Sequence, residues 1–307
     1  MFVFITANLI AQSTYVPDDI FESYLETHNS SGIPVSMGNP TSMGNGISND
    51  NYVLNSRINT VAVLQVINIG INDLTGIESF DLLSHLNCSQ NNLSSINVSQ
   101  NTSLQYLYCS YNNLSSLNLN QNIALKKLMC SLNDLTSLDL TNNLFLTDLW
   151  CDENQISYLN ISQNNSLLIL NCYGNQLQTL NISHCSNMVE LYCGSNQLIC
   201  LNIATQTEYG MFLNAMNNPN LSCIKISSIN IPPQSVASII DPQMYYSVNC
   251  SNNCSTAASL NELTKEKKLI KTTDLMGRQI NPNTQLNILL INYYNNGTFD
   301  KVFILPK

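Results

Sequence analysis

The sequence is poor in charged residues, in histidine and in tryptophan. Of its 307 residues, 10% are Asp, Glu, Lys or Arg, three are His and one is Trp. Because 44% of the residues are hydrophobic, this low charge excludes a chain kept disordered by charge repulsion. The only histidines are His28, His85 and His184, and no Ser–His–Asp arrangement or Gly-rich phosphate loop is indicated. The sequence therefore gives little support to an enzyme, a cofactor or a metal site.

Basic residues are scarcest in the first part of the chain. Residues 1–255 contain 4 Lys or Arg against 16 Asp or Glu, whereas residues 256–307 contain 7 against 4. A body with a net charge near −12 argues against binding of DNA or RNA, since phosphate binding needs clustered Lys and Arg. The change in charge also predicts two modules.

Long apolar runs are missing after the first residues, so no transmembrane helix is predicted. The start, "MFVFITANLIAQS", resembles the second half of a Sec signal peptide with cleavage after Ala11. A basic n-region is absent, and we therefore expect residues 1–11 to be a partial signal and the true start to lie upstream. A buried first strand is the alternative. A signal peptide implies export through the periplasm, to a secreted or outer-surface location.

What the chain has in abundance is a regular repeat. Six cysteines are each 21 residues apart, and each is preceded by Leu at two positions and followed by Asn at three. The unit reads L-x-x-L-x-C-x-x-N-x-L. Its cysteines are Cys88, Cys109, Cys130, Cys151, Cys172 and Cys193, and its asparagines are Asn91, Asn112, Asn133, Asn154, Asn175 and Asn196. Ten residues after each L-x-C-x-x-N comes a second L-x-L-x-x-N half.

This unit resembles the leucine-rich repeat, with Cys in a slot that usually holds Leu, over about residues 66–226. The resemblance implies a β-rich solenoid with a parallel concave sheet. A repeat of 21 residues leaves no room for a long convex helix, so we expect the far side to be extended or a second short strand. We predict an N-terminal cap with a short helix and loop at 12–60, the solenoid at 61–226, and a C-terminal cap or linker at 227–263.

The ladder of cysteines has three possible uses: a metal site, a disulfide ladder, or buried thiols. Leu and Cys two residues apart on a strand point to the same apolar face. Neighbouring parallel strands lie about 4.8 Å apart, which is within disulfide range, but their side chains point the same way. A straight ladder also does not converge around an ion. Free Cys packs as a small apolar residue, and the next copy holds Ala215. We therefore predict buried thiols and no metal.

Both ends of the solenoid need caps. Behind a possible cap at Asp18, a helix is predicted with Ile20, Phe21, Tyr24 and Leu25 on one face. A first atypical coil follows, with Ile67, Ile69, Leu74, Ile77 and Phe80 expected to point inward. This arrangement resembles the N-terminal cap of secreted leucine-rich repeat proteins of the Bacteroidetes type. At the other end, we expect a structural disulfide that joins Cys223 to Cys250 or Cys254, consistent with an oxidising compartment.

The last residues, 264–307, predict a small C-terminal β module made of two hairpins. In the first hairpin, Leu269-Ile270 and Leu275-Met276 flank polar residues and Gly277 makes a turn, and in the second hairpin the turn is Asn296-Gly297. The segments "DLMGR", "YNNGT" and "KVFIL" resemble a type A sorting tail of the type IX secretion system. The resemblance implies recognition by that export machinery. An ordinary β cap on the solenoid is the alternative.

Side chains that the repeat leaves free are expected to face outward from the concave sheet. They form columns in which aromatic residues recur, and such residues give large contact area with few rotors to freeze. We predict a ligand-binding surface whose anchors are Tyr106, Tyr108, Trp150, Tyr173 and Tyr192, with Asp148 and Asp152 adding polarity. The alternative is that strand-favouring aromatics only cover the sheet.

These observations predict a secreted or surface-displayed, non-enzymatic module that binds a protein or glycan partner. A structural spacer or matrix component without a specific ligand is the first alternative. A hydrolase that uses Asp148 and Asp152 is the second, because these carboxylates cluster beside Trp150 in the sequence. No cofactor is predicted.

Overall fold

The computed structural model describes residues 12–204, 211–227 and 236–250, together with the strands at 269–273, 289–294 and 299–303. The predicted signal at 1–11 lies outside the described residues. The chain divides into two compact units, Met1–Cys254 and Ser255–Lys307.

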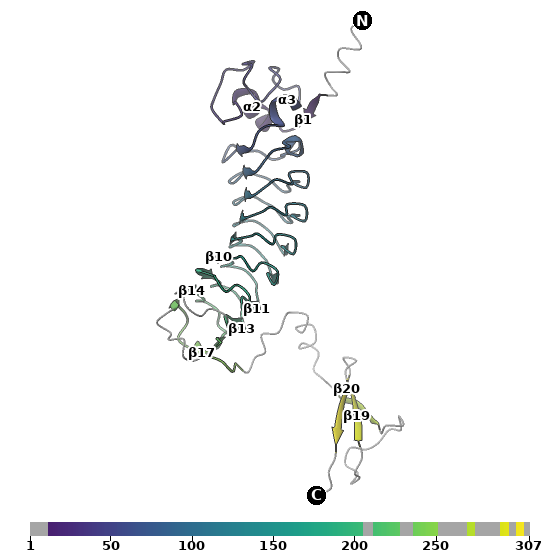
Figure 1. The fold of residues 1–307 in the computed structure, drawn as a ribbon, viewed down its shortest axis with the longest axis vertical. Coiled ribbons are helices and arrows are strands. Elements are labelled where there is room, and N and C mark those ends of the chain that lie inside the picture. Colours follow the sequence, from purple (N-terminus) through teal and green to yellow (C-terminus); the bar gives the residue numbers. More distant parts are fainter. Residues whose placement is uncertain are drawn as a thin grey trace. The chain divides into compact units, whose positions relative to one another are not determined.

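A nine-stranded parallel sheet, the long sheet, runs through the first unit, and each coil contributes one strand. Leu86 pairs with Leu107, Leu107 with Leu128, and Leu128 with Leu149, so the repeat keeps its register from coil to coil. The coils stack on one another in Figure 1. The strands are β3 (Val63–Gln65), β4 (His85–Asn87), β5 (Tyr106–Tyr108), β6 (Lys127–Met129), β8 (Asp148–Trp150), β10 (Ile169–Asn171), β12 (Glu190–Tyr192), β14 (Met211–Asn214) and β16 (Val236–Ile239).

The opposite side of the solenoid consists of extended segments and short strands. Between residues 81 and 204, all of which the structure describes, no helix forms. Figure 1 labels β10 and β14 on one side of the stack and β11 and β13 on the other. The prediction of a solenoid without long convex helices is confirmed. These short parallel strands are β7 (Leu138–Asp139), β9 (Leu159–Asn160), β11 (Thr179–Asn181), β13 (Cys200–Asn202), β15 (Cys223–Lys225) and β17 (Tyr245–Ser247).

The ladder cysteines lie in the core as free thiols. All six are buried and unpaired. Burial raises the pKa of the Cys88 and Cys193 thiols to about 12 and raises the pKa of the four thiols between them well above the usual value. The thiols are therefore protonated near neutral pH and pack as small apolar groups. The prediction of buried thiols is confirmed.

The asparagines of the repeat hold neighbouring coils together. The amide nitrogen of Asn112 donates to the carbonyl oxygens of Cys88 and Cys109, both at 3.1 Å, and its Oδ1 accepts the Leu93 N–H at 3.0 Å. Asn133 and Asn154 repeat the same bonds one coil further along each time. Each buried Asn thus forms hydrogen bonds with backbone N–H and C=O groups that have no partner in a strand.

A second column of asparagines lines the other turn. Asn101, Asn122, Asn143 and Asn164 are buried, and each donates from its amide nitrogen to carbonyl groups of the preceding coil. In this column the Oδ1 atoms have no hydrogen-bond partner in the described residues. Cys185, which replaces Asn there, is buried as well.

The N-terminal cap contains the predicted helix, α2 (Asp19–Thr27), whose inward face carries the buried Phe21 and Leu25. Asp18 caps it, since its Oδ1 accepts the N–H groups of Ile20 and Phe21. Its Oδ2 accepts the N–H groups of Asn72 and Asp73 at 2.8 and 3.1 Å, so one carboxylate joins the helix to the first coil. The cap is completed by β1 (Ser13–Tyr15), β2 (Tyr52–Leu54), α3 (Asn55–Ile58) and the 3-10 helix η1 (Ile77–Ser79).

The prediction for the first coil is wrong at two positions. Ile67 and Ile69 are 39% and 36% exposed, whereas Val66 and Ile71 are fully buried. The reason is register: Leu64 pairs with Leu86, which places Val66 beside Cys88 on the inward face. Ile67 and Ile69 then fall in the turn around Asn68, which has φ +54°. Leu74, Ile77 and Phe80 are buried as predicted.

Disulfide bonds form at the C-terminal end of the first unit. Cys223 and Cys250 form a disulfide with a Cα–Cα distance of 5.7 Å, which is one of the two predicted pairings. Cys254 lies outside the described residues. Cys200, which the sequence did not single out, is disulfide-bonded as well.

The second unit contains a three-stranded antiparallel sheet of β18 (Leu269–Thr273), β19 (Leu289–Tyr294) and β20 (Phe299–Phe303). Strands β19 and β20 pair antiparallel on either side of Asn296-Gly297, as expected for the second hairpin. Strand β18 pairs antiparallel with β19. Leu275-Met276 and Gly277 of the predicted first hairpin lie outside the described residues.

Candidate binding surface

The outward face of the long sheet is formed by the first and third residues of its three-residue strands and by Phe212 and Asn214 of β14. The middle residue of strands β4, β5, β6, β8 and β12 is a buried Leu, and the two flanking side chains are half-buried. This follows from alternation, because neighbouring side chains on a strand point to opposite faces. Strand pairing aligns the outward residues in two columns. One contains Val63, His85, Tyr106, Lys127, Asp148, Ile169, Glu190 and Phe212, and the other Gln65, Asn87, Tyr108, Met129, Trp150, Asn171, Tyr192 and Asn214.

One aromatic cluster lies near the N-terminal end of this face. The rings of His85 and Tyr106 are stacked, with centroids 4.2 Å apart and planes 15° apart. The ring of His85 is also held by a contact of 2.8 Å between its Nδ1 and the Ser84 hydroxyl. Tyr108 is in the other column, beside Asn87 and Met129. His85 is thus part of the outward face of the long sheet.

A second aromatic cluster covers the strands β8 to β14. Ring centroids of Trp150 and Tyr192 are 6.4 Å apart, and those of Tyr192 and Phe212 are 5.3 Å apart. Trp150 and Tyr192 are two strands apart and flank the nearly buried Asn171 between them. The Tyr192 hydroxyl donates to Glu190 at 3.1 Å. Phe212 was not among the predicted anchors; it follows Glu190 in the first column after 22 residues.

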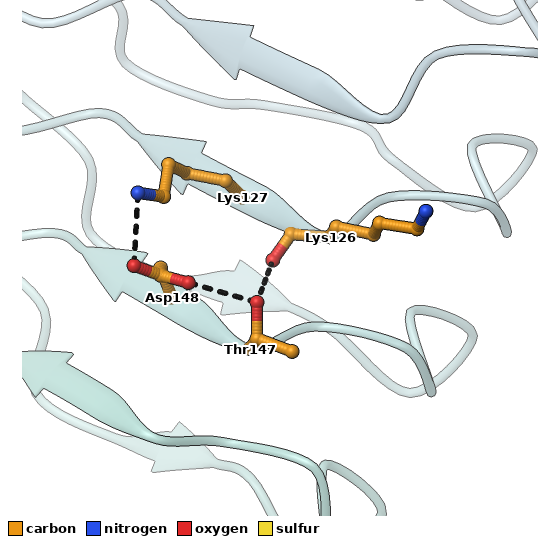
Figure 2. A network of polar contacts seen from close by, with 4 residues as sticks. All are labelled: Lys126, Lys127, Thr147 and Asp148. Atoms are coloured by element: carbon orange, nitrogen blue, oxygen red, sulfur yellow. Dashed lines mark hydrogen bonds and ion pairs between the residues drawn. The ribbon is translucent and has the colours of Figure 1, made fainter. Parts of the chain in front are cut away.

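An ion pair separates the two clusters. Lys127 Nζ lies 2.9 Å from Asp148 Oδ1, and the Thr147 hydroxyl donates to Asp148 Oδ2 at 2.8 Å. Figure 2 shows this network, in which the Thr147 hydroxyl also contacts the Lys126 carbonyl oxygen. The hydrogen bond to Asp148 raises the pKa of Lys127, so the Lys127 ammonium keeps its charge at neutral pH. The middle of the face is therefore polar but locally neutralised.

Asp152 follows the ladder cysteine Cys151, and Tyr173 follows Cys172, so both lie just beyond the ends of their strands. The Ser131 hydroxyl donates to Asp152 Oδ1 at 2.5 Å. Tyr173 packs against Gly194, where an added Cβ would lie 3.1 Å from the tyrosine ring. Asp148 and Asp152 therefore have different partners: Lys127 and Thr147 bind the first carboxylate and Ser131 binds the second.

Two further properties bear on function. In the part of the chain that the structure describes, no group of three or more His, Cys, Asp or Glu side chains is arranged to hold a metal ion. None of the described helices has the length and apolarity needed to span a membrane.

Comparison with solved structures defines the class of fold. The chain is similar to internalin C2 of Listeria monocytogenes, with a TM-score of 0.56 and 20% identity over 75% of this chain and 98% of that chain. It is also similar to the internalin inlF of the same organism, with a TM-score of 0.51 and 18% identity over 70% and 74%. The fold is a leucine-rich repeat solenoid, and such solenoids typically serve as protein-interaction modules.

No protein-family model matches the sequence, and no curated protein matches it. Sequence identities near 20% establish the fold of this chain. They do not identify a ligand, because one fold serves many functions.

Proposed function

We propose that this protein is a non-enzymatic recognition module that binds a partner protein, or a glycan, through the outward face of its long sheet. The observation that carries the proposal is the aromatic cluster of Trp150, Tyr192 and Phe212, in which the Tyr192 ring lies between the other two, with centroids 6.4 Å from Trp150 and 5.3 Å from Phe212. Binding energy at interfaces concentrates in Trp, Tyr and Arg anchors that are surrounded by near-neutral contacts.

The geometry supports a preformed surface. Each anchor stands on a strand whose middle Leu is buried in the core, so its backbone cannot move without disturbing the coil. Ring-to-ring contacts and the bond from Tyr192 to Glu190 further restrict the side chains. A rigid surface loses little conformational entropy on binding, which favours affinity.

The test is substitution of the single tryptophan after a partner has been found on a protein and glycan array. We expect Trp150→Ala to weaken binding by about 2 kcal/mol or more, as truncation of a hot-spot residue does. Tyr158→Ala is the matched control, because Tyr158 is 45% exposed and lies outside the long sheet. Unchanged affinity of Trp150→Ala, with an unchanged circular dichroism spectrum, would contradict the proposal.

We also propose a secreted or outer-surface location reached through the type IX machinery. The motifs at 264–307 and the apolar start support it, and the disulfide between Cys223 and Cys250 suits an oxidising compartment. Deletion of 264–307 in the host cell should leave the protein in the periplasm, as detected by cell fractionation. Surface display that persists without these residues would overturn this part of the proposal.

A structural role is the second candidate, and one observation favours it. Ile123, Leu144 and Phe145, which lie on neighbouring coils, are 58%, 49% and 62% exposed. Exposed apolar groups of this kind mark association surfaces when they are contiguous. Concentration-dependent self-assembly that Phe145→Asp abolishes, without a partner on the arrays, would favour a spacer over a recognition module.

A further inference from the structure

A small hollow lies where the N-terminal cap meets the long sheet. It has a volume of about 260 Å³ and is lined by Tyr24, Ser31, Gly32, Met43, Val63, Leu64 and Gln65. Three of these residues form strand β3, the first strand of the sheet. The others come from helix α2 and from the loop after it. The hollow is therefore at the end of the outward face, one strand away from the stacked rings of His85 and Tyr106.

The loop that follows helix α2 and lines the hollow beside strand β3 is held by hydrogen bonds at both ends. Asn29 Oδ1 accepts the N–H groups of Ser31 and Ile33, both at 3.0 Å. At the other end of the loop, the Met43 N–H donates to the His28 carbonyl oxygen at 2.9 Å, and Arg57 donates to the Gly44 carbonyl oxygen at 2.6 Å. The hollow is thus part of the folded cap and does not need to be formed by a ligand.

None of the seven lining residues is charged. The apolar floor is provided by Val63, which is 45% exposed, because Met43 and Leu64 are buried and offer a ligand little surface. Neutral hydrogen-bonding groups surround this floor: the Tyr24 hydroxyl, the Ser31 hydroxyl and the Gln65 amide. These side-chain groups make no hydrogen bond within the described part of the chain, and each is available to a ligand.

Tyr24 is placed for such a contact. Its ring is stacked on His28 with centroids 4.0 Å apart and planes 9° apart, which fixes the direction of the hydroxyl. Burial raises the pKa of Tyr24, so the hydroxyl keeps its proton and can both donate and accept.

We propose that this hollow is a binding site for one neutral pyranose residue of a carbohydrate. A pyranose has an apolar ring face and hydroxyl groups around its rim, and the hollow has an apolar floor at Val63 and neutral donors and acceptors around it. Pockets for drug-sized ligands measure about 300–1,000 Å³, so 260 Å³ suits a single sugar unit. A tyrosine or phenylalanine side chain of a protein partner fits less well, because it offers at most one hydroxyl for three groups.

This site is separate from the cluster around Trp150, and its existence does not rest on the proposed function of that cluster. The experiment uses saturation-transfer difference NMR on the full chain, with the methyl glycosides of glucose, galactose, mannose and N-acetylglucosamine at millimolar concentration. We expect transfer to at least one of these sugars. Val63→Trp, which fills the hollow from an exposed position, should abolish it.

Tyr24→Phe provides the finer test, because it keeps the ring and its stack on His28 and removes only the hydroxyl. We expect about 2- to 10-fold weaker binding, the effect of one neutral hydrogen bond. Tyr52→Phe, a tyrosine of the same cap outside the hollow, should bind like the wild type. Tyr158→Ala, at an exposed tyrosine outside both the hollow and the long sheet, should also keep sugar binding.

Two results would overturn the inference. One is the absence of transfer to every sugar of the panel, which includes the case of a hollow that takes a peptide side chain. The other is sugar binding that Val63→Trp leaves unchanged, which would place the sugar elsewhere on the molecule.

Discussion

At the scale of single residues, the slot held by the ladder cysteines explains why the repeat uses sulfur. Cys130 and its equivalents are fully buried, and each donates its backbone N–H to the carbonyl of the next coil, as Cys130 does to Trp150 at 2.8 Å. The side chain has to be small and apolar, and Ala215 meets the same requirement. The thiol therefore acts by packing.

The buried thiols predict a loss of stability at alkaline pH. The ordinary thiol pKa is 9.0, and burial raises that of Cys130 well above it. Above pH ~9 the unfolded chain releases this proton and the folded chain does not, so stability is present below this pH and falls above it, by about 1.4 kcal/mol per pH unit and thiol. Cys130→Ala should cost about 1–2 kcal/mol at neutral pH.

The cost of this substitution should shrink by about 1.4 kcal/mol between pH about 8 and pH about 10. Urea unfolding at several pH values measures it. Leu128→Ala is the control, because this buried side chain does not ionise and its cost should stay constant. Parallel pH curves for wild type and Cys130→Ala would show that the folded thiol titrates normally.

The ladder asparagines predict that alanine substitution at two adjacent asparagines, Asn112 and Asn113, has very different effects on stability. Asn112 is buried and bonds backbone groups of two coils, whereas the side chain of Asn113 is exposed. Asn112→Ala leaves buried N–H and C=O groups unpaired and should cost about 3 kcal/mol or more. Asn113→Ala should change stability by less than about 0.5 kcal/mol. Chemical denaturation of both variants decides the matter, and equal costs would remove the structural role assigned to the ladder.

At the scale of elements, every coil turns at the same place with a left-handed residue. The position two after each cysteine has positive φ, including Tyr111 at +57° and Leu132 at +51°. Bulky residues rarely adopt this conformation and lose roughly 1–2 kcal/mol in it. The turn tolerates them because Asn112 and Asn133, the next residues along the chain, bond the backbone of the turn. The repeat geometry therefore overrides local preference.

The N-terminal cap depends on the carboxylate of Asp18. Asp18→Ala removes the acceptor for two N–H groups of helix α2 and two of the first coil. We expect a loss of about 2–3 kcal/mol, measured by thermal or chemical unfolding. Asp19→Ala is the control, since this exposed side chain contributes only through the helix dipole, less than about 1 kcal/mol. A cost for Asp18→Ala no larger than for Asp19→Ala would mean that water replaces these bonds freely.

At the scale of the whole molecule, stability is distributed along the solenoid. Each coil contacts only its neighbours, so an end coil lacks half of its contacts unless something replaces them. At the N-terminus helix α2 and the sheet of β1 and β2 do so. At the C-terminus the disulfide between Cys223 and Cys250 joins the start of strand β15 to the segment just after β17, the strand that pairs with β15.

Removal of this disulfide should loosen the C-terminal end first. We expect the double variant Cys223→Ser with Cys250→Ser to lose about 3 kcal/mol, the entropy of a loop of 27 residues in the unfolded chain. Hydrogen exchange should increase in β15 and β17 before it does in β4 and β5. Asn249→Ala, an exposed neighbour, should match the wild type. Uniform exchange along the whole solenoid would argue for a single cooperative unit instead.

The sequence by itself determined the solenoid, because a constant period of 21 residues forces each coil into the register of the last. It also determined which side chains face inward, since alternation on a strand leaves Leu107 and Cys109 no other direction. Where the period changes, this reasoning fails. Ile67 and Ile69 were placed inward and are exposed, and Phe212 was missed.

Only the tertiary structure decided which outward side chains meet. The contact of Trp150 with Tyr192 across Asn171, the ion pair of Lys127 with Asp148 and the partner of Asp152 depend on how side chains from different coils lean. The hollow under the loop after α2 likewise joins residues about 40 positions apart in the chain, Tyr24 and Val63. Periodicity places each residue on a face, but distances between side chains of different coils exist only once the coils have packed.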